Sequence, residues 1–184
     1  HDATLGQERP GLKGAELNFD FNQTGGRVGL SMRDGYLDFP GLFDEPRLPF
    51  ARLTGDVRWE RDGAHLSVDV PNLRFGNADA QGELQLKWRT GEARAYPGVL
   101  DLQGNLSRAD AGRVHRYLPT SISKEVRDYI HSAIPSGDAA MVKFKVKGNL
   151  DDFPFETAKQ GEFRVSANLK DVTYDYAPAL VLEK

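Results

Sequence analysis

Few residues in this chain are of types that do chemistry, and their spacing matches no known catalytic or metal-binding pattern. The four histidines are His1, His65, His115 and His131, and there is no cysteine. No histidine stands in an H-x-H or HExxH arrangement, and no thiolate can join them around a metal ion. We therefore expect no metal site, and we expect His115 and His131 on the solvated sides of helices.

The other candidates for catalysis have simpler explanations. Asp151-Asp152 is the nearest approach to paired carboxylates, but its Gly-Asn-Leu-Asp-Asp context is typical of a turn. Arg113 and Arg116 could bind a phosphate, although arginines are equally expected on the solvated face of a helix. The chain has no phosphate-binding glycine loop and no G-x-S-x-G motif. The sequence thus predicts a protein that is not an enzyme.

Composition excludes some classes of partner. The chain has 184 residues, enough for one domain with a real core. Its formal net charge of −3 provides no basic face, so we expect no nucleic-acid partner. No run of about 18 apolar residues is present, which predicts no membrane-spanning helix. The absence of cysteine is compatible with the cytosol or with the bacterial periplasm.

Most of the chain alternates apolar and polar residues with a period of two, which is typical of strands with one apolar face. About ten strands are expected, in an antiparallel meander, because continuous apolar runs are rare. Trp59 and Trp88 stand at apolar positions, where core packing or ligand stacking could use them. The residues that we expect on the apolar face, as candidates to line a groove, are Leu17, Phe19, Phe21, Val28, Leu30, Val57, Trp59, Leu84, Leu86, Trp88, Leu102, Phe144, Val146, Phe163 and Val165.

Two features interrupt or mark this alternation. Residues 36–50 contain three prolines and are predicted to cross an edge or end of the sheet, with their aromatic side chains tucked inward. Glycine recurs inside predicted strands in apolar-x-Gly units, for example at Gly55, Gly104 and Gly148. Because glycine is unfavourable within strands, this recurrence predicts a repeated bend, bulge or close backbone approach.

Residues 110–135 alone have helical periodicity. Asp110 is expected to cap a first helix, and Pro119 to separate it from a second. A broken helical hairpin with one apolar face is therefore predicted, lying as a lid on the apolar side of the sheet. Its apolar side chains are Val114, Tyr117, Leu118, Ile122, Val126, Ile130 and Ile134. Its opposite face is expected in water and carries Lys124, Glu125, Arg127, Asp128 and His131.

The apolar faces of so many strands form a surface too large to leave in water, and one broken helix covers only part of it. Two architectures remain open on these grounds. The sheet closes on itself as a sandwich or barrel, or it is a curved open sheet whose concave apolar face serves a function.

Several motifs, taken in order, resemble the YhdP family of AsmA-like proteins of Gram-negative bacteria. They are LDFPGLFDEP at Leu37–Pro46, RYLP at Arg116–Pro119 before an amphipathic helix, V-x-G-x-L-x-D-F-P-F at Val146–Phe155, and DYAP at Asp175–Pro178. The likeness runs in register along essentially the whole chain. The family typically continues after Tyr-Ala-Pro with a Trp-Pro pair, whereas this chain continues with Ala179-Leu180.

The resemblance implies a mainly β fold. It is a twisted antiparallel β-groove, meaning an open, curved sheet with an apolar concave face, of about ten strands with a broken helical hairpin inserted at about 110–135. Residues 1–184 would be a single fragment of a larger repeat protein, with β repeats over 1–109 and 136–184. The full-length protein would be periplasmic and anchored in the inner membrane.

The implied function is bridge-like lipid transport without a cofactor. Such a segment shields phospholipid acyl chains in an apolar groove between the inner and outer membranes and so supports the outer-membrane permeability barrier. Its partners would be those acyl chains and, through the full-length protein, both membranes. The alternative is a closed β-sandwich with a structural or protein-interaction role and no lipid binding. Exposed strand edges could also pair with a second copy of the fragment.

Overall fold

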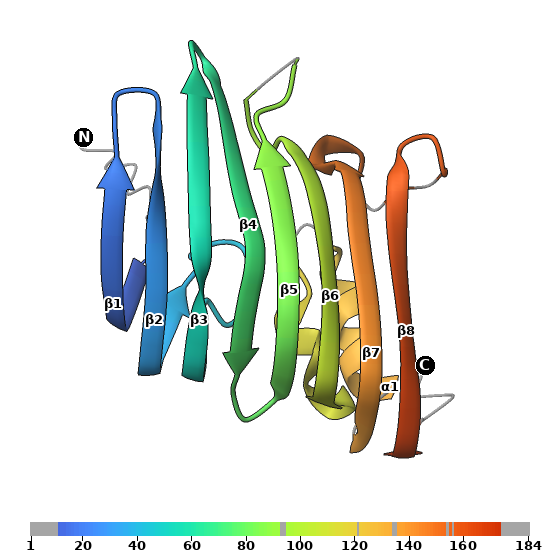
Figure 1. Ribbon diagram of the computed structural model, residues 1–184. Helices are drawn as coiled ribbons and strands as arrows, with labels where there is room; N and C mark the ends of the chain where they lie inside the picture. Colours follow the sequence, from blue (N-terminus) through green and yellow to red (C-terminus); the bar gives the residue numbers. More distant parts are fainter. Residues whose placement is uncertain are drawn as a thin grey trace, which may run out of the picture.

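The computed structural model describes residues 11–92, 95–120, 122–133, 136–153, 155 and 157–173. Eight strands in these residues form one sheet in sequential order, and each neighbouring pair is antiparallel (Figure 1). The predicted open antiparallel sheet is confirmed, and the closed sandwich is wrong for these residues, because no second sheet faces the first. The strands are β1 (Gly11–Phe21), β2 (Gly25–Asp38), β3 (Arg47–Asp62), β4 (His65–Gly76), β5 (Ala80–Arg89), β6 (Val99–Asp110), β7 (Ser136–Asn149) and β8 (Gly161–Thr173).

Helices lie within the predicted insertion, between β6 and β7. They are the 3-10 helix η1 (Ala111–Tyr117) and the α-helix α1 (Lys124–Ala133), and a second short 3-10 helix, η2 (Leu150–Asp152), follows β7. Asp110 caps η1 as expected, since its Oδ1 accepts a hydrogen bond of 2.9 Å from the Gly112 N–H. Figure 1 shows α1 on one side of the sheet only, behind β6 and β7 and towards one end of the strands.

The core lies between this side of the sheet and the segments packed on it. Met32, Leu48, Phe50 and Leu53 are buried together. Side chains from outside the sheet close this cluster, among them Phe39 and Phe43 of the β2–β3 connection and Tyr117 of η1. The prediction that aromatic residues of 36–50 turn inward is confirmed for Phe39, Phe43 and Phe50.

The prediction that residues 36–50 interrupt the sheet is wrong at both ends of the segment. Residues 36–38 complete β2, and residues 47–50 begin β3, where Pro49 pairs with Tyr36. The register of β3 with β4 ends at Arg52 opposite Gly76. This part of β3 is therefore a local edge, and an edge strand tolerates a proline that cannot donate a hydrogen bond.

The number of strands is lower than expected in part because residues 66–70 and 73–75, predicted as two strands, both belong to β4. Pro71-Asn72 falls at a shift of register between Val70 and Leu73, so β4 bends there and continues. The sequence also predicts a hairpin turn at Asp34-Gly35, which is wrong, because β2 runs through it with Asp34 at a φ of 50°. A separate last strand is predicted with Val172, Tyr174 and Tyr176. Val172 belongs to β8, and residues 174–176 lie outside the described residues.

The recurring glycines stand at bulges and close approaches, as predicted. The β1–β2 register shifts between Lys13 and Ala15, and Gly14 between them has a φ of 79°. At Gly55 a Cβ atom would lie 2.6 Å from the backbone oxygen of Asn72. At Gly104 a Cβ atom would collide with the ring of Phe144, which lies across the glycine.

Candidate functional site

The sheet has one apolar and one polar face. Side chains of residues directly opposite each other in an antiparallel pair lie on the same face. The register places all of the predicted apolar-face residues on one face, the one that carries the core cluster; we call it the apolar face. The intervening residues, such as Gln85 and Lys143, lie on the opposite, polar face. Binding of a ligand by the apolar-face residues stays a prediction.

The apolar face is covered at one end of its strands and open at the other. At the covered end Met32 and Leu53 are 1% and 0% exposed. Towards the other end, Phe19 and Phe21 of β1 are 59% and 70% exposed, and Phe163 of β8 is 56% exposed. The part of the apolar face that the helical insertion and the β2–β3 connection leave uncovered is here called the open apolar surface. Its residues are Leu17, Phe19, Phe21, Val28, Val57, Trp59, Leu84, Leu86, Trp88, Leu102, Phe144, Val146, Phe163 and Val165.

The predicted lid residues lie in different environments. Tyr117 packs against the core cluster, whereas Val114 is 38% exposed. Leu118, Ile122 and Ile130 are partly buried. The side chain of Val126 and the whole of Ile134 lie outside the described residues. The most deeply buried side chain described in α1 is Ala133, at 1% exposed.

A buried arginine joins α1 to the β2–β3 connection. Arg127 donates from Nε and Nη2 to the two carboxylate oxygens of Asp44, at 2.9 and 3.0 Å. Its Nη1 also donates to the carbonyl oxygens of Thr120 and Ile122. The sequence interpretation that put Arg127 on the solvated face is wrong, because the residue is 8% exposed. The helical period alone does not reveal that a carboxylate from a distant loop reaches this arginine.

A second polar cluster joins η1 to the β4–β5 turn. Arg116 forms ion pairs with Asp79 and, at 2.9 Å, with Glu45. The Tyr117 hydroxyl donates to Asp79 Oδ2 at 2.9 Å and accepts from Asn77 Nδ2 at 3.0 Å. Burial raises the pKa of Tyr117 to about 12. Because Asp79 and Glu45 hold its guanidinium, Arg116 is not free to bind a phosphate.

The two histidines of the insertion meet each other. His115 Nδ1 lies 3.0 Å from His131 Nδ1, and the ring centroids are 3.9 Å apart. Burial lowers the pKa of His115, and the neighbouring His131 lowers it further. The expectation that both histidines lie on the solvated sides of the helices is confirmed for His131, which is exposed, but not for His115, which is partly buried. Among the described residues no group of three potential ligands is placed to hold a metal ion.

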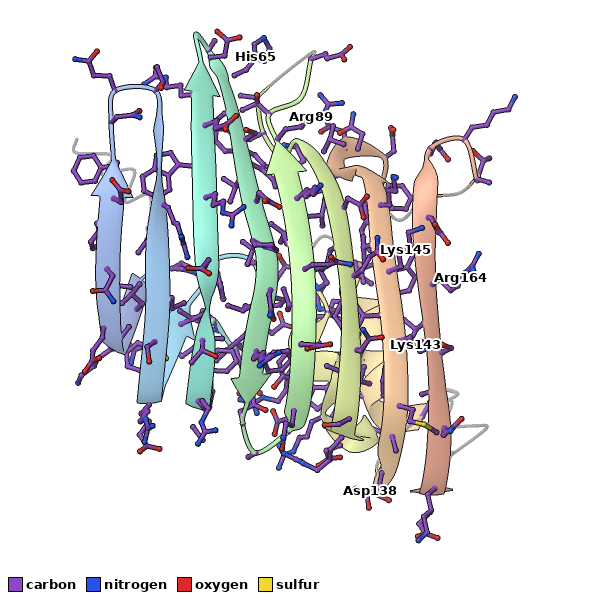
Figure 2. The ribbon with its side chains drawn as sticks, viewed as in Figure 1. His65, Arg89, Asp138, Lys143, Lys145 and Arg164 are labelled. Atoms are coloured by element: carbon purple, nitrogen blue, oxygen red, sulfur yellow. The ribbon has the colours of Figure 1, made fainter. Side chains whose placement is uncertain are left out.

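The polar face carries hollows of a different character. One, of about 560 Å³, is lined by charged and amide side chains that include Gln85, Gln103 and Lys145. Figure 2 shows Lys143 and Lys145 on β7 beside Arg164 on β8, in the view where α1 lies behind the sheet. Lys145 and Arg164 both pair with Glu162, at 2.7 and 3.1 Å. Such a lining suits water and ions. An apolar ligand would therefore bind on the apolar face and not in this hollow.

Comparison with known proteins gives one match. The model of the family described as YhdP protein matches residues 5–182, nearly the whole chain. No curated protein and no solved structure matches the chain.

Proposed function

The chain belongs to the YhdP family, and from that membership together with the open apolar surface we propose that it is a segment of a bridge-like lipid-transport protein. In this proposal phospholipid acyl chains lie against the open apolar surface while they pass between the inner and outer membranes. Movement of lipid in this way supports the permeability barrier of the outer membrane. No chemical step is involved, and none of the described side chains needs to act as a catalyst.

The observation that carries the proposal is the exposure of large apolar side chains on one continuous face. Phe19, Phe21, Phe163 and Val165 are each more than half exposed. Soluble proteins rarely leave a contiguous apolar surface of this extent in water without a partner for it. The polar face, with paired charges such as Lys145 and Glu162, needs no such partner.

The energetics favour acyl chains as that partner. An acyl methylene exposed to water costs about 0.8 kcal/mol, so a chain of about 14 methylenes faces a barrier near 11 kcal/mol in water. Contact with apolar side chains removes much of this cost for the methylenes of the acyl chain that face the protein. A surface open along its length binds less tightly than an enclosed pocket, which allows the lipid to leave as well as to enter.

The helical insertion limits how much of the apolar face is available. η1 and the β2–β3 connection close the face over the core cluster, and Arg127 and Asp44 fix α1 to that connection. We propose that the insertion sets one boundary of the lipid path. No helix in the described part of the chain is both long and apolar enough to cross a membrane. A periplasmic position and an inner-membrane anchor elsewhere in the full-length protein are part of the proposal.

The two outer strands provide the means to extend the path. Within the described residues, β1 pairs only with β2 and β8 only with β7. Their outer edges can accept a further strand, from a neighbouring part of a longer chain or from a second copy of the fragment. A second copy would appear in sedimentation experiments as a dimer whose population grows with protein concentration.

Lipid extraction tests the proposal. The protein, purified without detergent, should carry phospholipid that mass spectrometry of an organic extract detects in an amount proportional to the protein. The signal should fall to background for a variant that carries aspartate at both Leu86 and Phe144. Protein that is free of lipid, and that takes none up from vesicles, would contradict the proposal.

A further inference from the structure

A row of aromatic residues crosses the apolar face at its open end. An unbroken series of cross-strand pairs runs from Phe21 through Gly26, Trp59 and Val68 to Trp88. Phe21, Trp59 and Trp88 stand near the ends of β1, β3 and β5. The β1–β2, β3–β4 and β5–β6 connections that follow these strands all turn at one end of the sheet (Figure 1).

The row continues beyond Trp88 to the last strand. Trp88 is followed across the sheet by Leu100, Gly148 and Gly161. Both glycines face the ring of Phe155, because a Cβ atom at either would lie within 2.7 Å of it. We call Phe21, Trp59, Trp88 and Phe155 the aromatic row, and it spans the sheet from β1 to β8.

The aromatic row borders polar chain. The tip of the β3–β4 hairpin, residues 60–65, is exposed and contains Arg61, Asp62 and His65. Beside the row, Tyr96 stacks on Trp88 with ring centroids 5.6 Å apart, and Tyr96 is 66% exposed. The Trp88 Nε1–H donates to the Pro97 carbonyl oxygen at 2.8 Å. The row thus separates apolar side chains from water, which is the position that tryptophan and tyrosine favour at membrane interfaces.

The distance from the aromatic row to the covered end is long enough for the hydrocarbon of one leaflet of a bilayer. Along β3, Trp59 in the row and Leu53 in the core cluster are six residues apart on the same face. At about 3.3 Å per residue this is about 20 Å. The hydrocarbon of one leaflet is about 15 Å thick, half of a core of about 30 Å. An extended acyl chain of that length fits between the row and the insertion.

We propose that bound phospholipids have a fixed orientation: the glycerol and headgroup lie at the aromatic row, and the methyl ends of the acyl chains point towards the helical insertion. The inference rests on the proposed function and adds to it the direction of the lipid on the surface. The hairpin tips beyond the row are then the side along which the polar headgroups pass. The insertion closes the opposite side. Only the methyl ends of the acyl chains approach that side.

The two tryptophans of the chain allow a direct test, since both belong to the aromatic row. The 184-residue chain is loaded with phosphatidylcholine that carries a fluorescence-quenching doxyl group either near the glycerol or near the methyl end of one acyl chain. Unbound lipid is removed by gel filtration. The quenching of Trp59 and Trp88 by the two lipids is then compared at equal lipid content.

A matched variant reports from the other side of the open apolar surface. It replaces both native tryptophans by phenylalanine and carries Phe144→Trp, whose ring lies over Gly104, two rows nearer the covered end. All three changes keep an aromatic ring in place. Circular dichroism checks that the variant has the same fold.

The proposal predicts that the glycerol-proximal doxyl group quenches the native tryptophans at least about twofold more than the terminal one, with the reverse order in the Phe144→Trp variant. The same order in both proteins, or equal quenching by both lipids, would overturn the orientation while leaving lipid binding intact. If neither lipid is retained or neither quenches any tryptophan, the proposed function fails together with this inference.

Discussion

Replacing Leu86 by aspartate should weaken lipid binding strongly while the chain still folds. Leu86 lies in the middle of the apolar face of β5, opposite Val70 on one side and Leu102 on the other. Gln85, its neighbour along the strand, points to the polar face and pairs with Gln103. Leu86→Asp and Gln85→Asp therefore add the same charge one residue apart but on opposite faces.

The expected magnitudes follow from these positions. The Leu86 side chain is only partly buried, so an aspartate there can keep its carboxylate in water. The loss of two cross-strand apolar contacts should cost about 1–2 kcal/mol of stability. If the charge keeps an acyl chain from contacting this region, three or four methylenes lose their cover at about 0.8 kcal/mol each. The lost binding energy of about 3 kcal/mol corresponds to about a 100-fold weaker affinity.

Titration with a fluorescent fatty-acyl phospholipid measures the affinity, and urea unfolding measures the stability of each variant. Gln85→Asp should bind as the original chain does, within about twofold. Equal affinities for Leu86→Asp and the original chain would refute the assignment of the open apolar surface as the lipid path. So would a loss of binding in Gln85→Asp alone.

Three further predictions concern the scaffold. Asp79→Ala leaves the largely buried Arg116 without one of its two carboxylates. The free energy of unfolding in urea should therefore fall by about 3 kcal/mol. An unchanged urea midpoint would contradict a stabilising role for this cluster. Gly104→Ala should cost about 1–3 kcal/mol because the added methyl group meets an aromatic ring. Gly76→Ala should change the melting temperature little, because the added methyl group has its nearest neighbour, Gln81 Cγ, at 3.8 Å. Because the pKa of His115 is lowered in the fold, the unfolded chain takes up the proton first as the pH falls below about 6.5, and stability should fall until the lowered pKa is passed. His115→Gln should flatten this part of the stability profile, and a profile identical to that of the original chain would show that the ring is not the cause.

The sequence predicts the apolar face well because its period of two is a local property. Residues as far apart as Leu17 and Val165 fall on one face, since alternation within each strand and sequential antiparallel pairing suffice to place them. The helical insertion between β6 and β7 is predictable for the same reason, from its period and from its cap at Asp110.

Long-range contacts and local edges decide the rest. Asp44 and Arg127 are 83 residues apart, and no local pattern indicates that they meet. Pro49 would exclude a central strand, but β4 ends opposite Arg52 and leaves that part of β3 with one neighbour. Which end of the apolar face is covered depends on where the insertion docks. Hence the face could be predicted, but neither its covered end nor its aromatic row at the open end.

Site-specific photo-cross-linking in the full-length protein within living cells tests the central claim most directly. A photoreactive amino acid is placed at Phe163 on the apolar face of β8 and, as the matched position, at Arg164 on the polar face. Phospholipid adducts are expected at Phe163, and none above background at Arg164. The absence of lipid adducts at Phe163, or equal adducts at both positions, would contradict the claim that this surface carries lipid.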